Sequence, residues 1–123
     1  MTAERMDEQR FKERTKHLAL QIIKLVERLP KNRTAEVLGK QLLRAATSVA
    51  ANYRAACRGK SVADVIAKLS LVEEEADESL LWMELLRESE LIGTGELTEL
   101  MTETGEIVAM TVASIKTLRG QKR

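Results

Sequence analysis

The chain has 123 residues, of which 44% are hydrophobic, 32% are charged and 2% are aromatic, and its formal net charge is +1. This composition excludes a disordered chain and predicts one domain, residues 1–123, with a single core of aliphatic side chains. The one cysteine, Cys57, excludes an intrachain disulfide, and the lack of a long apolar run or an apolar leader segment predicts a cytoplasmic protein without membrane spans.

The first half of the chain predicts two helices, over residues 6–29 and 34–58. In both segments apolar side chains recur at steps of three and four residues, the spacing that places them on one face of a helix. Pro30 ends the first helix, Thr34 is the expected N-cap of the second, and Gly59 fits the position that follows it. The second helix is rich in alanine, so we expect its neighbours to pack closely against it.

The second half predicts two more helices, over residues 61–91 and 96–119. Ser61–Asp64 has the spacing of a capping box, which opens the third helix. The fourth helix is expected to begin after a cap at Thr94 or Gly95. Four helices joined by short turns predict an all-α, antiparallel up-down-up-down four-helix bundle.

The third helix carries two apolar stripes. Its main stripe runs from Val62 to Met83, and a second stripe falls on roughly the opposite side at 100° per residue. Each helix of a lone bundle needs only one such stripe, so the second predicts contact with another subunit. The residues expected at this oligomer interface are Leu71, Leu81, Trp82 and Leu85.

Polar side chains of the second and third helices predict a network between them. Its expected members are Arg44, Ser48, Asn52, Arg54, Glu73, Asp77 and Glu78. In the structural interpretation, half-buried carboxylates pair with the arginines and fix the register of the helices; the remote alternative is an enzyme that uses the same cluster. A di-metal site needs Glu-x-x-His motifs, whereas the one histidine, His17, follows Glu13 by four residues. We therefore expect no catalytic residue, cofactor or metal, and a Cys57 that acts as a small apolar side chain.

Charge is distributed unevenly along the chain. Residues 1–60 carry 14 Lys/Arg against 6 Asp/Glu, a net charge of +8, and residues 61–123 carry 6 against 13, a net charge of −7. The predicted topology gathers basic residues at the end of the bundle that holds both termini. They could contact nucleic-acid phosphates without sequence preference, or they could be ordinary solubilising charges. The candidate nucleic-acid contacts are Arg54, Arg58, Lys60, Lys116 and Arg119.

The segment 41–53 resembles the bacterial four-helix bundle family named after proteins encoded in 23S rRNA intervening sequences. The family pattern Gln-Leu-x-Arg-Ala-Ala-x-Ser-(Ile/Val)-x-Ala-Asn is matched by Gln41, Leu42, Arg44, Ala45, Ala46, Ser48, Val49, Ala51 and Asn52. The run 67–80, followed by Trp82, is similar to one branch of the family, and the likeness spans nearly the whole chain. Ala50 stands where many members have proline, which favours a straighter second helix here.

The resemblance implies a bundle that assembles as a ring, commonly a pentamer, in a family without a settled biochemical activity. A distant relative, the accessory protein of diversity-generating retroelements, is similar in assembly and binds nucleic acid and a reverse transcriptase through a basic surface. The sequence thus leads to a homo-oligomeric interaction or scaffold protein, with its own copies and an unidentified protein as partners. The alternative is a nucleic-acid-binding accessory protein, related to rRNA or retroelements, that holds RNA or DNA at the basic end.

Overall fold

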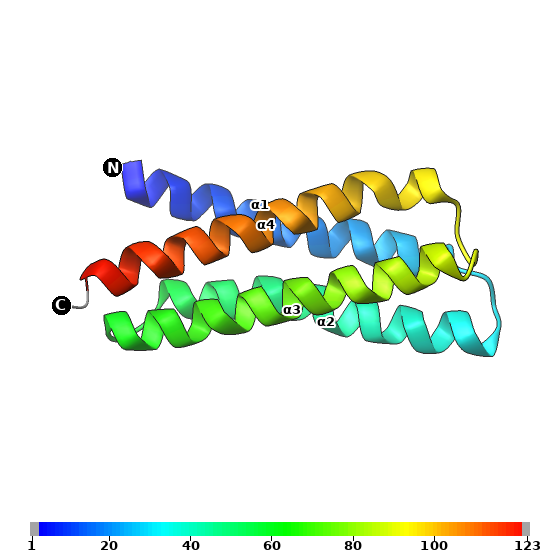
Figure 1. The fold of residues 1–123 in the computed structure, drawn as a ribbon, viewed down its shortest axis with the longest axis horizontal. Helices are drawn as coiled ribbons and strands as arrows, with labels where there is room; N and C mark the ends of the chain where they lie inside the picture. Colours follow the sequence, from blue (N-terminus) through cyan, green and yellow to red (C-terminus); the bar gives the residue numbers. More distant parts are fainter. Residues whose placement is uncertain (1–2, 122–123) are drawn as a thin grey trace.

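The computed structural model describes the backbone of residues 3–121 and the side chains of residues 7–121. Within these residues the chain forms four α-helices and no strand, as the sequence predicted. The helices are α1 (Ala3–Glu27), α2 (Arg33–Cys57), α3 (Val62–Glu88) and α4 (Thr94–Gln121). They run alternately up and down the bundle, so both ends of the described chain and the α2–α3 turn lie at the same end of the molecule (Figure 1).

The two middle helices begin at side-chain caps. Asn32, in extended conformation, accepts a hydrogen bond from the backbone N–H of Ala35 at 2.9 Å. The prediction of Thr34 as this cap is wrong, because α2 begins one residue before it. Ser61 was predicted correctly: its Oγ accepts from the N–H of Asp64 at 3.1 Å. The Asp64 carboxylate in turn accepts from the backbone N–H of Lys60 at 3.0 Å, so two free donors at the start of α3 are satisfied.

The helix ends differ from the predicted ones by a few residues. α1 stops two residues before the expected end, and α3 stops at Glu88, three residues early. Glu90 has a φ of 60°, so a non-glycine residue makes the left-handed step after α3. Thr94 is the first residue of α4 and does not precede it as a cap. Gly59 does follow α2, but its φ is not positive, and the reason for glycine there is lack of space.

The core is built from the predicted aliphatic stripes. It joins one side of each helix, and every member of the following set is fully buried: Ile22 and Leu25 of α1, Leu42 and Val49 of α2, Val72 and Met83 of α3, and Leu97 and Ile107 of α4. Ala45 and Ala46 are also fully buried, so α2 contributes small side chains where its neighbours contribute large ones. This arrangement lets α2 approach its neighbours closely.

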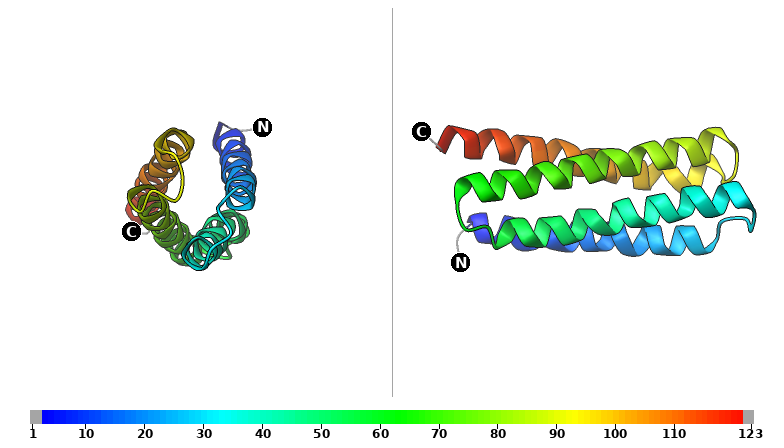
Figure 2. Two further views of the ribbon diagram at one scale, coloured as in Figure 1. Left: turned by 90° about the vertical axis from the view of Figure 1, so that its right-hand side faces the viewer. Right: turned by 90° about the horizontal axis from the view of Figure 1, so that it is seen from below.

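α1 and α4 are the least closely packed pair of neighbouring helices. Seen from the end, the helices form a U with α1 and α4 at its two tips (Figure 2). α1 and α4 contact each other far less than consecutive helices do. Arg14 of α1 bridges these two helices: its guanidinium donates to Glu103 at 2.6 and 2.9 Å and to Glu106 at 3.1 Å. No helix within the described residues combines the length and the apolar character needed to cross a membrane.

Candidate functional site

A small polar cluster joins α2 and α3 near the middle of the bundle. Arg44 donates to Glu75 at 3.1 Å and to Glu78 at 2.5 Å, and Trp82 Nε1 donates to the same Glu78 oxygen at 3.3 Å. The Arg44 side chain is 51% exposed. The two carboxylates, Glu75 foremost, raise the pKa of Arg44 above its ordinary value, so this residue keeps its charge. The cluster therefore consists of two ion pairs that share an exposed arginine, with half-buried carboxylates and an aromatic neighbour.

The rest of the predicted polar network does not join this cluster. Arg54 is exposed, and within residues 7–121 no ion pair includes it. Asn52 Nδ2 donates to the backbone carbonyl of Ser48 at 2.9 Å, which is a bond within α2. Glu73 and Asp77 lie two positions to either side of Glu75. At 100° per residue their side chains point about 160° away from it, and Glu75 takes the place in the pair that they were expected to fill.

A row of exposed leucines lies on the outside of α3, and we call it the α3 leucine face: Leu71, Leu81 and Leu85, which are 41%, 46% and 40% exposed. Trp82, predicted with them, is half-buried and packs against the core. On α2, Val37 is 55% exposed and was not among the predicted interface residues. Its position off the main stripe of α2 was the signal that could have identified it.

Arg44 and Val37 belong to α2, whereas Glu75, Glu78 and the α3 leucine face belong to α3. The two helices lie side by side along the bundle and are turned toward the viewer on the right of Figure 2. Arg44 lies level with Glu75 and Glu78 because it bonds to both. Since the helices are antiparallel, Val37, seven residues before Arg44, lies at nearly the same level as Leu85, seven residues after Glu78.

The end of the bundle that holds the α2–α3 turn and the last turns of α4 carries the predicted basic residues (Figure 1). We call it the basic pole; its side chains, all exposed, are Arg54, Arg58, Lys60, Lys116 and Arg119. Within residues 7–121 the ion pairs at 4.0 Å or less include none of the five. Their charges are therefore free to face solvent or a ligand.

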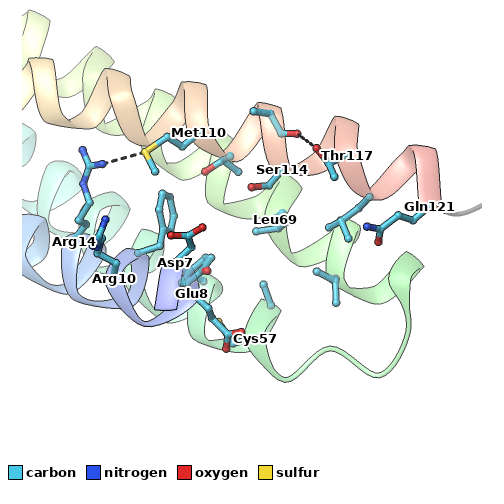
Figure 3. Close-up of a pocket in the computed structure, with 17 residues that line it drawn as sticks. Asp7, Glu8, Arg10, Arg14, Cys57, Leu69, Met110, Ser114, Thr117 and Gln121 are labelled. Atoms are coloured by element: carbon cyan, nitrogen blue, oxygen red, sulfur yellow. Dashed lines mark hydrogen bonds between the residues drawn. The ribbon is translucent and has the colours of Figure 1, made fainter. Parts of the chain in front are cut away.

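A groove opens at the same end, where α1 and α4 diverge. Its volume is about 880 Å³, and all four helices contribute to its walls (Figure 3). Phe11 and Tyr53, which both line the groove, form an aromatic pair with ring centroids 4.6 Å apart. Met110 and Arg14 meet at one end of the groove, where the guanidinium donates to the sulfur at 3.1 Å. Sequence reasoning missed this groove.

Cys57 lies in the wall of the groove beside Tyr53. Burial, and after it the nearby Glu8 carboxylate, raises the pKa of the Cys57 thiol to about 11. Burial also raises the pKa of Tyr53, and the nearby thiol adds to that shift. Both groups are therefore neutral near pH 7, and the thiolate needed for nucleophilic chemistry is scarce. This environment fits a cysteine that acts as a small, mainly apolar side chain.

Metal ligands do not gather in the described part of the chain. His17 is exposed on α1, and no group of three or more His, Cys, Asp or Glu side chains within that part is placed to hold an ion. The acidic run of α3 is spread around its helix and does not converge on one point.

Comparisons with known proteins agree with this fold. The sequence profile of the family described as 23S rRNA-intervening sequence protein matches residues 7–113. Among solved structures, the chain is similar to the 1.70 Å crystal structure of a protein with unknown function from the S23 ribosomal protein family of Bacteroides thetaiotaomicron VPI-5482. The two sequences are 32% identical, the match covers 89% of this chain and 97% of that chain, and the TM-score is 0.83. Comparison with curated proteins found no significant match.

Proposed function

This chain belongs to the 23S rRNA-intervening sequence protein family, and from that premise we propose that it is a homo-oligomeric interaction protein and not an enzyme. Its copies close into a ring, and five is the ring size that the family resemblance implies. The observation that carries the proposal is the α3 leucine face, three leucines that are each at least 40% exposed on one side of one helix. Side chains of this size gathered on one surface are typical of a protein–protein contact.

The distribution of charge supports a head-to-tail contact. The net charge of residues 1–60 is +8 and that of residues 61–123 is −7. In a ring each copy presents one surface to the next copy and a different surface to the previous one, so two different surfaces meet. A basic surface then faces an acidic one at every contact, which favours this arrangement over contact between like surfaces.

Light scattering coupled to size exclusion tests the proposal. We expect the wild-type protein to have several times the protomer mass of 13.8 kDa, and five times that mass for the pentamer. Replacing Leu81 and Leu85 by lysine should reduce the mass to that of the protomer with unchanged helicity, since both side chains are exposed. Leu20→Lys is the matched control, because Leu20 is a leucine 47% exposed on the outside of α1. A monomeric wild-type protein at tens of micromolar would refute the proposal.

We propose nucleic-acid binding as the second candidate function, on the strength of the basic pole. Five exposed basic side chains share this end without intramolecular ion pairs in residues 7–121. A ring would repeat the pole on one rim and multiply a weak affinity through effective concentration. Contacts with phosphates alone would bind RNA or DNA regardless of sequence and weaken steeply with salt.

A filter-binding titration of structured RNA at 50 mM and 200 mM salt tests this candidate. We expect retention at the lower salt and its loss when Arg58, Lys60 and Arg119 are replaced by glutamate. The control replaces Lys16, Lys24 and Lys31 by glutamate, which changes the net charge equally at exposed positions of α1 and the α1–α2 turn. Equal loss in both variants would indicate a response to net charge only. No retention of the wild-type ring at 50 mM salt would leave only the protein-interaction function.

A further inference from the structure

We infer that the outer face of α2 is the surface that receives the α3 leucine face of a neighbouring copy. We call it the α2 basic face and define it by three exposed residues, Arg33, Val37 and Lys40. The inference rests on the proposed homo-oligomer and identifies the surface that contacts the leucines of the neighbouring copy. The partner is a second copy of this chain.

Charge complementarity between the two helices is the first support. α2 carries four basic residues against one acidic residue, whereas α3 carries eight acidic residues against two basic ones. Within one copy only Arg44 connects the two sets, through its bonds to Glu75 and Glu78. In residues 7–121 no other ion pair links α2 to α3. Most charges of the two helices therefore remain available to a second copy.

The register of α2 and α3 supplies the second support. The Arg44–Glu78 bond sets these two residues at one level. Val37 lies about 10 Å from that level along α2, and Leu85 lies about 10 Å from it in the same direction along α3, since each is seven residues away at about 1.5 Å per residue. Lys40 falls about 6 Å from the level of the pair by the same count, close to that of Leu81.

The symmetry of a ring determines which residues of neighbouring copies lie at the same level. In a ring whose axis runs parallel to the helices, every copy has the same height, so a residue of α2 meets the residues of α3 that share its level. Val37 then meets Leu81 and Leu85, and Lys40 meets the acidic side chains on either side of these leucines. A two-fold axis perpendicular to the helices, with α2 lying on α2, would bring basic side chains together and is disfavoured.

Two variants with opposite charge changes test the pairing. The α2 variant carries Val37→Glu and Lys40→Glu, and the α3 variant carries Leu81→Lys and Leu85→Lys. Each alone places like charges against the unchanged surface of its neighbour, so each should fall to the protomer mass of 13.8 kDa. Mixed in equal amounts, the variants regain opposite charges at both kinds of contact. A ring with an odd number of copies cannot alternate the two variants without one contact between like charges. We therefore expect the mixture to form complexes with an even number of protomers, at least two, that contain both variants in a 1:1 ratio.

The control variant carries Leu20→Glu and Lys24→Glu on α1, with the same charge change as the α2 variant at two exposed positions. It should keep the wild-type mass. Far-UV circular dichroism verifies folding, and Lys40→Glu alone replaces the α2 variant if the double substitution lowers helicity.

The outcomes separate this inference from the proposed function. An α2 variant with the wild-type mass, or an equal mixture that stays at 13.8 kDa, would overturn the pairing while the homo-oligomer stands. A wild-type protein of protomer mass would refute the homo-oligomer itself.

Discussion

Replacing Gly59 by alanine tests how tightly the α2–α3 turn is packed. A Cβ at this position would lie 2.3 Å from Val65 Cγ2, and 3.2 Å from both Val65 Cα and the carbonyl oxygen of Ala56. Carbon atoms pack at about 3.5–4.0 Å, so the first contact is far too short. Rotation of the valine side chain could relieve it, but the other two atoms belong to the backbone. The turn itself must shift, and we expect Gly59→Ala to lower the free energy of unfolding by about 1–3 kcal/mol.

Gly105→Ala is the matched control. Gly105 lies inside α4, and a Cβ there would meet nothing within 4 Å. Glycine within a helix is less favourable than alanine by about 0.5–1 kcal/mol, because it loses more conformational freedom on folding. The same substitution should therefore stabilise the protein at one position and destabilise it at the other.

Thermal and urea unfolding followed by circular dichroism measure both effects. All proteins must be compared at one concentration, because the proposed assembly would make stability depend on concentration. For a domain of this size, 1 kcal/mol corresponds to roughly 3–5 °C in Tm. The φ of Gly59 is not positive, so alanine suffers no penalty from backbone conformation there. A Gly59→Ala protein as stable as the wild type would refute the steric argument.

Three further predictions concern other parts of the bundle. Arg14→Ala removes the bridge between α1 and α4 and should cost about 1 kcal/mol in urea unfolding, less at high salt; an unchanged midpoint would contradict the bridge. Asn32→Ala should cost about 1 kcal/mol, whereas Thr34→Ala should cost much less, and equal costs would contradict the observed cap. The pKa of the Cys57 thiol is raised to about 11, so the rate of its alkylation should increase about tenfold per pH unit from pH 7 to pH 10, and a plateau below pH 9 would contradict this. Because Glu8 contributes to the raised pKa, the Glu8→Gln thiol should be alkylated faster than the wild-type thiol at pH 8. The raised pKa also means that the thiol stabilises the fold below pH 8 and that this contribution is lost as the pH rises toward 11.

Sequence periodicity predicted the interior well because burial follows the helical repeat directly. The stripe of α1 places Leu18, Ile22 and Leu25 together, and all three are buried. Helix ends were harder, because several residues near a turn can cap. Both Asn32 and Thr34 have suitable side chains, and the choice depends on where the chain leaves the turn after Pro30. Ser61 had no such rival, since its partner three residues later completes the motif.

Contacts between helices depend on how each helix is rotated about its own axis and on the angle between the helix axes. The periodicity of a single helix specifies neither. Acidic residues occupy five of the six positions 73–78, so some carboxylate of α3 faces α2 at almost any rotation. The structure selects Glu75 and Glu78 to face Arg44. The groove at the basic pole has a similar origin. It depends on the separation of α1 from α4, helices at opposite ends of the sequence whose mutual angle no local pattern specifies.

The structure divides the second stripe of α3, which the sequence predicted as one group of interface residues. Periodicity groups Trp82 with the leucines, but the structure separates them: the indole packs against the core and donates to Glu78, while Leu81 and Leu85 face outward. The leucines have no room to turn inward, because Val72 and Met83 already occupy the buried side of α3 with no exposed surface. In the proposed oligomer, the surface that covers them comes from outside the bundle. Because acidic side chains surround these leucines on α3, a basic surface with an apolar centre suits them best, and the α2 basic face with Val37 has that character.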